Sequence, residues 1–479
     1  MLDKCKPIYD NIVNNFTIRW FKMYWVEILS RIQFAFTISF HILFPAFSVG
    51  LATFLMIFEA LWLITKKDKY LAIVKFWTKV FALTFGMGVV SGIVMEFQLG
   101  TNWAGFSQKV GPVLGSLFTY EVLTAFFIEA GALGIMIFGW GKINKYVHFS
   151  ANFVIFVGVT LSAFWILSAN SWMQTPSGVS FAHGEFVINS WYDVIFNPSV
   201  IPRFIHMLIA SYLSTLLVIL GVSCYYILKG KSYDFAKTCI KFSVVSILLL
   251  SFSQIYVGDE VGIEVHKNQP LKTAAIEGVW NTQKGAPLVL FAYPSQSQEK
   301  NLFAIEIPKL ASLINTHTLD GKMLGLKSVA KEDRPLVAVV FYSFRIMVGI
   351  GFLMVFIGLA GTLLLFRQKI YTHKWFLKIC TLAAPLGFVA IITGWFTAEF
   401  GRQPWIVYNI LKTQYSVSDI SAWQVLLSLF SIVLVYFVIF GYFYFLYLLK
   451  LIKGGPDTPG KERMPYSYFQ SVETHTPKE

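Results

Sequence analysis

Charged residues and cysteines are scarce in this sequence. Asp, Glu, Lys and Arg make up 14% of its 479 residues, whereas hydrophobic residues make up 56%. An ordinary soluble domain carries about 25% charged residues, so the composition argues against a soluble protein. The four cysteines (Cys5, Cys224, Cys239 and Cys380) are scattered and never form a Cys-x-x-Cys pair. The sequence therefore suggests neither a structural zinc site nor an iron–sulfur centre.

The beginning of the chain also lacks a cleavable signal. Residues 1–27 are polar and aromatic, without an apolar core followed by small residues. We expect this stretch to be an N-terminal extension, in which residues 8–26 lie flat on the outer membrane surface as an amphipathic segment.

Long apolar runs recur along almost the whole chain. Runs of about 20 apolar residues are typical of transmembrane segments, and backbone groups in lipid must find partners within their own segment, which favours helices. The sequence therefore predicts an all-α polytopic membrane protein with about nine transmembrane helices. They are expected at residues 28–64, 71–99, 114–140, 147–173, 201–228, 235–256, 336–366, 375–399 and 421–450.

The polar residues between these runs divide the chain further. Residues 28–256 hold helices one to six, residues 257–335 form a long external loop, and residues 336–450 hold helices seven to nine. A connection of this length predicts a functional loop. The tail, 451–479, is expected to be cytoplasmic and disordered.

The net charge of +13 reflects where the basic residues lie, and it does not require nucleic acid as a partner. Basic residues collect at alternate connections, whereas the short loop 100–113 holds only Lys109. By the positive-inside rule the N-terminus is outside and the C-terminus is cytoplasmic. Four basic residues near the N-terminus go against this rule: Lys4, Lys6, Arg19 and Lys22.

The end of the eighth apolar run concentrates unusual residues. Between Gly394 and Trp405 the sequence places a carboxylate, Glu399, a guanidinium, Arg402, and two indoles. Gly401 and Pro404 are expected to end the helix there. A helix cap with an interfacial tryptophan explains such an ending in many membrane proteins. A buried acid in a lipid-embedded helix is nevertheless a candidate functional group.

Two of the eight histidines, His41 and His206, lie inside apolar runs. No third imidazole or thiolate accompanies them, which argues against zinc. Haem iron needs one or two axial ligands, and His with Met is a known pair. Met347 lies in the seventh run, although a methionine there can also be simple packing. Its neighbour Arg345 needs an anionic partner, and a haem propionate would serve.

The third run carries two acids, Glu121 and Glu129. In a regular helix they lie about 12 Å apart along the axis and roughly 80° apart around it. Two acids at different depths favour a proton relay or a ligand with a relay. Glu96 and Asn170 add polar groups in the second and fourth runs, where a helix-joining polar network is an equally good explanation.

With the predicted orientation, five of the candidate site residues lie at a similar depth in the membrane. His41, Glu121, His206, Met347 and Glu399 fall nearer the outer ends of their runs, on the side of the long loop. Oxidation there would release protons outside, whereas oxygen reduction would draw protons from the cytoplasm. Glu129, which lies deeper, is placed to hand them outward, so a proton gradient would form without pumping.

Taken together, the chain resembles subunit I of the cytochrome bd quinol oxidases from Leu29 to about Leu449. Several motifs in the right order carry the resemblance: Ser30-Arg31-Ile32-Gln33-Phe34-Ala35, Met95-Glu96-Phe97-Gln98, Gly100-Thr101-Asn102-Trp103, Ala169-Asn170 with Trp172-Met173-Gln174, Phe344-Arg345-Ile346-Met347 and the segment from Gly394 to Trp405.

The resemblance implies three haems and quinol as substrate. His206 and Met347 match the axial ligands of a low-spin haem b, with Arg345 beside it. His41 and Glu399 match the ligands of two high-spin haems, one haem b and one that is haem d, or haem b as the alternative. Further matches complete the implied sites: Glu121 near the high-spin pair; Glu129, Asn170 and Ser162 on the inner proton route; Trp395 and Arg402 lining the high-spin haems; and Lys272 and Glu277 in the quinol-binding loop.

The family resemblance also implies the setting of the protein. It implies a terminal quinol oxidase of an aerobic respiratory chain in the bacterial cytoplasmic (inner) membrane, which reduces O2 to water. The expected partners are a second large membrane subunit and possibly a small single-helix subunit. The N-terminal extension departs from the usual family start. The segment from Glu277 to Arg334 is short, as in the branch that lacks the long loop insertion, and this branch leaves the third haem open.

Two other functions stay open at the level of sequence. A proton- or ion-coupled transporter would use the same intramembrane acids, but such proteins commonly show two similar halves, and none is visible here. A quinone-reducing cytochrome b would need paired bis-histidine helices, and two intramembrane histidines are too few.

Overall fold

The computed structural model describes residues 24–182 and 184–456. Within these ranges nine helices are long and apolar enough to cross a membrane, as the sequence predicted. They run over Tyr24–Thr65, Asp68–Thr101, Ala104–Phe138, Lys145–Gln174, Trp191–Leu228, Tyr233–Asn268, Lys331–Phe366, Lys374–Phe400 and Ala422–Gly454. Most of the proposed surface segment 8–26, His183, His475 and most of the predicted tail lie outside the described residues.

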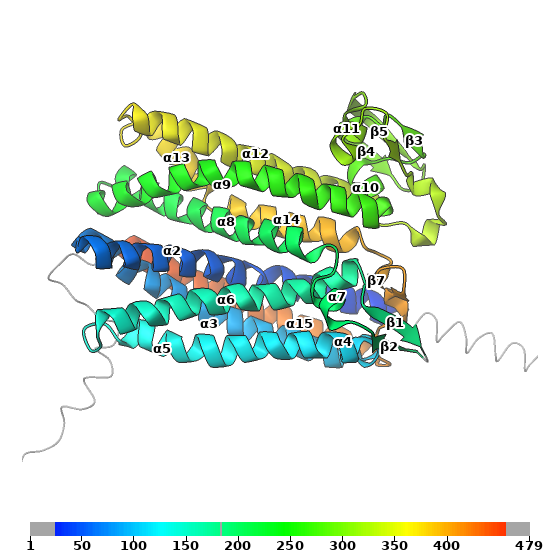
Figure 1. Ribbon diagram of the computed structural model, residues 1–479, viewed down its shortest axis with the longest axis horizontal. Coiled ribbons are helices and arrows are strands. Elements are labelled where there is room, and N and C mark those ends of the chain that lie inside the picture. Colours follow the sequence, from blue (N-terminus) through cyan, green and yellow to red (C-terminus); the bar gives the residue numbers. More distant parts are fainter. Residues whose placement is uncertain (1–23, 183, 457–479) are drawn as a thin grey trace, which may run out of the picture.

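The helices form a bundle of long antiparallel elements (Figure 1). The inner part of the first span is α2 (Leu43–Thr65), and the later spans contain α3 (Asp68–Thr101), α4 (Ala104–Leu123), α5 (Ala130–Phe138), α6 (Lys145–Gln174), α7 (Trp191–Ile195), α8 (Val200–Leu228), α9 (Tyr233–Asn268), α12 (Val337–Phe366), α13 (Lys374–Ala383), α14 (Leu386–Phe400), α15 (Ala422–Val435) and α16 (Phe445–Gly454). Two π-helical segments interrupt them: η1 (Thr124–Glu129) and η5 (Tyr436–Tyr444).

Two apolar clusters hold the bundle together. One joins α2, α3, α5, α6, α8 and the beginning of α9 around buried aromatic residues such as Phe58 and Trp77. The other joins α8, α9, α12 and α13 around leucines and isoleucines such as Leu220 and Ile247. The helices α8 and α9 contribute to both clusters, so this pair connects the two parts of the core.

Between α9 and α12 the chain forms a small lobe of residues 269–330, which lies at one end of the bundle (Figure 1). It contains α10 (Pro270–Glu277), α11 (Leu310–Thr316), and the antiparallel pairs β4 (Leu288–Ser295) with β5 (Lys300–Ile307) and β3 (Gln283–Lys284) with β6 (Lys322–Met323). Two further pairs lie at the same end: β1 (Val179–Ala182) with β2 (Glu185–Ile188), and β7 (Trp405–Val407) with β8 (Leu411–Lys412). We call this end the loop end.

Helix boundaries differ from the sequence prediction at several places. The sixth helix continues to Asn268, so Gly258–Glu260 are helical rather than part of the loop predicted from residue 257. The third span begins at Ala104 and includes Pro112, because its first polar turns are helical outside the apolar run. Glu121 consequently lies near the middle of its span and not towards the outer end. The eighth span is interrupted before Leu386, where Pro385 precedes α14.

Candidate functional site

The imidazole of His41 is held in one orientation. Its Nδ1 lies 2.9 Å from Ser91 Oγ, and the Ser91 hydroxyl itself is 2.9 Å from the carbonyl oxygen of Met87 and 3.1 Å from that of Gly88. The hydroxyl has one hydrogen, and the two carbonyl oxygens within reach of it favour the arrangement in which His41 Nδ1–H donates to Ser91. In this tautomer the Nε2 lone pair of a neutral His41 is free for a ligand, as in metal-binding histidines.

His206 lies on α8 with unpaired polar atoms around it. Its Nδ1 is buried without a hydrogen-bond partner, and so is Oε1 of Gln254 on α9. The Gln254 amide nitrogen donates to the main-chain oxygen of His206 at 3.1 Å and lies 3.2 Å from His206 Nε2. Buried polar groups in proteins nearly always have partners, so these orphaned atoms indicate a ligand beside the imidazole.

Glycines make room beside both His206 and Met347. A Cβ added to Gly258 on α9 would lie 3.5 Å from His206 Cε1, and one added to Gly394 on α14 would lie 2.9 Å from Met347 Sδ. The four helices concerned, α8, α9, α12 and α14, pack against one another. His206 and Met347 therefore lie on one packed group of helices, each beside a glycine of a neighbouring helix.

Arg345, two residues from Met347, binds the lobe. Its guanidinium donates to the carbonyl oxygens of Ile276, Val289, Leu290 and Phe341, and its Nη1 to Ile276 oxygen distance is 2.8 Å. It also stacks over the Phe341 ring at 3.3 Å. The haem propionate expected as its partner stays a prediction; the hydrogen bonds of Arg345 in this structure go to main-chain oxygens of the lobe and of its own helix α12.

Glu399 is the centre of a second polar cluster, at the loop end. Its Oε1 accepts from Asn170 Nδ2 at 3.0 Å and from Gln174 Nε2 at 3.2 Å, while its Oε2 accepts from Arg402 Nη2. The Arg402 side chain is 5% exposed, and its Nε and Nη1 have no partner. Arg203 reaches the cluster through Asn170, to whose Oδ1 it donates.

Lys272 of α10 joins the same cluster from the lobe. Its ammonium donates to Gln174 Oε1 at 2.5 Å and to Gln269 Oε1 at 2.7 Å. Lys272 is 3% exposed, and this burial, with the nearby positive charge of Arg203, holds the pKa of its amine well below the usual range. Three basic side chains thus surround the single carboxylate Glu399. Such an excess of buried positive charge favours an additional anionic group.

Glu277 lies five residues further along α10. Its Oε1 accepts from Asn315 Nδ2 at 3.0 Å, whereas its Oε2 is buried without a partner. Burial raises the pKa of the Glu277 carboxyl, although the hydrogen bond from Asn315 and the charge of Arg345 oppose this shift. The unpaired oxygen is free to accept a hydrogen bond from a hydroxyl group of a ligand.

The two acids of the third span face α6. Ser162 Oγ donates to Glu121 Oε1 at 2.9 Å. A Cβ at Gly158 would lie 2.7 Å from Glu129 Cγ, so the absence of a side chain at Gly158 accommodates Glu129. The angle predicted between the two acids is wrong, because the segment between them includes the π-helix η1 instead of a regular α-helix. Glu129 Oε1 is buried without a partner.

The partners of these groups follow one another along α6. Gly158, Ser162, Asn170 and Gln174 are separated by multiples of four residues, a spacing that turns by about 40° per step, so this row winds about 160° around the helix from Gly158 to Gln174. Asn170, for which the resemblance implies a place on the inner proton route, contacts Glu399 near the end of α6. Trp395 belongs to an apolar cluster with Ile42 and Met207, the sequence neighbours of His41 and His206.

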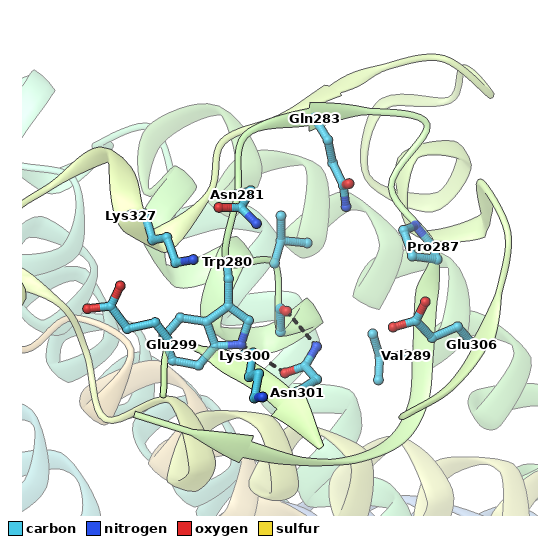
Figure 2. Close-up of a pocket in the computed structure, with 12 residues that line it drawn as sticks. Trp280, Asn281, Gln283, Pro287, Val289, Glu299, Lys300, Asn301, Glu306 and Lys327 are labelled. Carbon is cyan, nitrogen blue, oxygen red and sulfur yellow. Dashed lines mark hydrogen bonds between the residues drawn. The ribbon is translucent and has the colours of Figure 1, made fainter. Parts of the chain in front are cut away.

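A polar cavity of about 310 Å³ lies in the lobe, immediately after Glu277. Figure 2 shows Trp280 and Asn301 at its centre, where Trp280 Nε1 donates to Asn301 Oδ1 at 2.9 Å. Asn301 Nδ2 in turn donates to the Gly278 oxygen at 2.9 Å. Val289, whose carbonyl binds Arg345, lines this cavity. None of the predicted site residues lines it.

Several residues of the clusters were not predicted as site residues from the sequence: Ser91, Gln174, Arg203, Gln254, Gly258 and Asn315. Gln174 and Arg203 carried a usable signal, because both are polar residues at the edge of apolar runs. The roles of Ser91 and Gly258 depend on which helix packs against them, and the sequence around each residue does not show which helix that is.

A cofactor with an iron centre and carboxylate side groups fits this donor set. Axial ligands of the kinds that haem iron accepts are present. They are the unpaired Nδ1 of His206, the Nε2 of His41 and the Met347 thioether, which lies beside Gly394. The unpaired Nε and Nη1 of Arg402 suit a carboxylate. Haem therefore fits the residues present.

Comparisons with known proteins agree with this fit. The sequence model of the family "Cytochrome bd terminal oxidase subunit I" matches residues 29–456. The cytochrome bd-II ubiquinol oxidase subunit 1 of Escherichia coli is 34% identical, over 85% of this chain and 93% of that protein. The cytochrome bd ubiquinol oxidase subunit 1 of Bacillus subtilis is 35% identical, over 85% and 90%. The structure of the bd oxidase from Geobacillus thermodenitrificans superposes with a TM-score of 0.84 at 28% identity, covering 91% of this chain and all of that one.

Proposed function

This chain belongs to the cytochrome bd terminal oxidase subunit I family, and we propose that it is the haem-bearing subunit of a quinol:oxygen oxidoreductase. The relatives named above are ubiquinol oxidase subunits, which supports quinol as the electron donor. The enzyme works in a bacterial inner membrane with a second large subunit, and a small single-helix subunit is a further expected partner. The loop end faces outward, with the C-terminus in the cytoplasm.

Four side chains would hold the iron of the haems. His206 and Met347 would hold a low-spin haem b, beside the space that Gly258 and Gly394 leave. His41 and Glu399 would hold the two high-spin haems, one haem b and one haem d or b. When bound, the haems would supply electron transfer from quinol to oxygen. Ser91, as acceptor of the His41 Nδ1–H, would leave Nε2 available for iron, and the unpaired N–H groups of Arg402 would suit an anionic side group of the cofactor.

The quinol binds at the lobe, beside α10. Glu277 accepts a quinol O–H at its unpaired Oε2, while Asn315 holds its Oε1. Arg345 fixes the lobe against α12 through the carbonyl oxygens of Ile276 and Val289, which keeps Glu277 in place. Lys272 contributes a buried amine on the same helix. Protons from quinol leave to the outside.

Protons for oxygen reduction come from the cytoplasmic side along α6. Glu129 holds a proton at its unpaired Oε1, and Glu121, which accepts from Ser162, is the next carboxylate towards the loop end. A proton that passes from Glu129 to Glu121 moves along α6 from Gly158 to Ser162, in the direction of Glu399. Because the protons used and released lie on opposite sides of the membrane, turnover builds a gradient without pumping.

The single observation that carries the proposal is the unpaired Nδ1 of His206, on a group of helices in which Met347 lies beside a glycine. The test is to purify the complex, determine its haem by the pyridine haemochrome reaction and record oxygen consumption with quinol. We expect stoichiometric haem and quinol-dependent oxygen uptake. A colourless protein would refute the proposal and favour a transporter that uses the intramembrane acids.

A further inference from the structure

One side chain, Gln174, connects the lobe to Glu399. Gln174 is the last residue of α6 and is 1% exposed. Its Oε1 accepts from Lys272 Nζ at 2.5 Å and from Gln269 Nε2 at 3.0 Å, while its Nε2 donates to Glu399 Oε1 at 3.2 Å. Lys272 belongs to the proposed quinol site and Glu399 to the proposed haem site, so one amide touches both.

The chemistry of the partners fixes the orientation of this amide. An ionised carboxylate can only accept, so Gln174 must turn its amide nitrogen to Glu399. Its oxygen is then left for the N–H groups of Lys272 and Gln269, and a flipped amide would lose these contacts. Lys272 has Gln269 as its second acceptor, at 2.7 Å, which holds the ammonium between two glutamine oxygens.

The backbone at Gly401 is shaped around the same lysine. A Cβ at Gly401 would lie 2.6 Å from Lys272 Cγ and 3.1 Å from its Cδ. Gly401 has a φ of −69°, which any residue adopts, so the requirement for glycine is the space taken by the Lys272 stem. Gly401, two residues after Glu399, therefore leaves space for the side chain of Lys272, a residue of the proposed quinol site.

A second amide on α6 provides an internal comparison. Asn170, one turn before Gln174, also donates to Glu399 Oε1, but its oxygen accepts from Arg203 of α8. Asn170 therefore links Glu399 to a basic residue of the bundle, and Gln174 links it to a basic residue of the lobe. Both amides therefore donate to Glu399, but the basic residue that binds the amide oxygen is Arg203 for Asn170 and Lys272 for Gln174.

We propose that Gln174 is a positioning residue that connects the quinol-site Lys272 to the Glu399 carboxylate, so that occupancy of the quinol site changes the environment of Glu399. The inference rests on the proposed function, since it takes Lys272 to lie in the quinol site and Glu399 to lie at a haem. Binding of a quinol-like ligand that moves the Lys272 ammonium would pull on Gln174 Oε1 and, through its rigid amide plane, on the hydrogen bond to Glu399.

The experiment measures two quantities in the purified haem-loaded complex. One is the KM for a soluble short-chain quinol. The other is the optical difference spectrum of the high-spin haems when a redox-inactive quinone analogue is added without turnover. Gln174→Leu removes both ends of the bridge. Because a hydrogen bond to a charged group contributes about 1.5–3 kcal/mol, we expect the KM to rise about tenfold or more. The analogue-induced difference spectrum should disappear.

Two further variants separate the ends of the bridge. Asn170→Leu should alter the resting high-spin spectrum but keep the analogue-induced change, because Asn170 does not contact Lys272. Gln174→Glu still offers Lys272 an acceptor but cannot donate to Glu399, so its KM should stay within about twofold of the parent while the analogue-induced spectral change disappears. This variant keeps the test decisive if Gln174→Leu loads haem poorly. Gln108→Leu, at an exposed position on α4, controls for loss of a glutamine.

The outcomes are distinct. A parental KM and a parental difference spectrum in Gln174→Leu would overturn the inference, and so would a Gln174→Glu variant whose KM rises as far as that of Gln174→Leu. If the parent complex itself neither loads haem nor consumes oxygen with quinol, the proposed function fails instead.

Discussion

Replacing Gly394 by alanine tests the placement of Met347 without touching any ligand. A Cβ at residue 394 would lie 2.9 Å from Met347 Sδ. Non-bonded carbon contacts are optimal at about 3.5–4.0 Å, so the thioether must retreat by roughly 0.6 Å or more. Gly394 is in the middle of α14, where alanine favours the helix, so the new contact is the main effect of the substitution.

The size of the effect follows from the cost of overpacking. An extra methyl group in a tightly packed site costs about 1–3 kcal/mol. If the whole cost falls on the iron–thioether contact, the ratio of ligated to unligated Met347 drops by about 5- to 150-fold. We therefore expect the low-spin absorption band of the reduced protein to weaken or convert to a high-spin form. The haem content should be normal, since His206 is unchanged.

The assay is the absorption spectrum of the reduced complex, with haem quantified in the same sample. Gly454→Ala is the matched control, because a Cβ at Gly454, at the far end of α16, has no atom within 4 Å. An unchanged low-spin band in Gly394→Ala, at normal haem content, would refute the assignment of Met347 as an axial ligand.

Four other substitutions probe the remaining parts of the account. Ser91→Ala removes the acceptor of the His41 Nδ1–H, and haem affinity at that site, measured by transfer to a haem scavenger, should fall about 10- to 100-fold; an unchanged transfer rate would contradict the role of Ser91. Glu277→Gln should flatten the pH dependence of kcat/KM for quinol. Because the pKa of the Glu277 carboxyl is raised, this group becomes protonated in the parent as the pH falls through a range above that of an ordinary glutamate, and its Oε2 then stops being a free acceptor. A parental pH profile in this variant would exclude Glu277 as the acceptor. Glu129→Gln should slow oxygen consumption by about 100-fold while quinol KM is unchanged, and a normal turnover rate would refute the relay. Gly401→Ala should displace the Lys272 stem and raise the quinol KM, and an unchanged KM would show that the lysine position does not matter.

The sequence was sufficient for the membrane architecture because lipid imposes a simple rule. Apolar runs long enough to cross the bilayer must be helices, and the nine predicted runs correspond to nine spans in the described chain. Their ends were less predictable, since helices such as α9 continue beyond the apolar run into polar sequence. The π-helix η1 was not predictable either, because it is an irregularity without a composition of its own.

For the site, the sequence indicated chemical types but not contacts. A charge within an apolar run marks Arg345 as needing partners, yet its partners, the carbonyl oxygens of Ile276 and Val289, lie 69 and 56 residues away in the chain. The same holds for Lys272 and Gln174, which are 98 residues apart. Such pairs are brought together by the packing of the lobe on the bundle, which residue patterns within one element do not report.

The central claim is that imidazole, thioether and carboxylate groups within this bundle hold haem iron. The most direct test is a haem determination on the purified complex, combined with the reduced spectrum of His206→Ala. The account predicts bound haem in the parent and loss of the low-spin signal, with high-spin signal retained, in the variant. A parent without haem, or a variant with the parental spectrum, would contradict it.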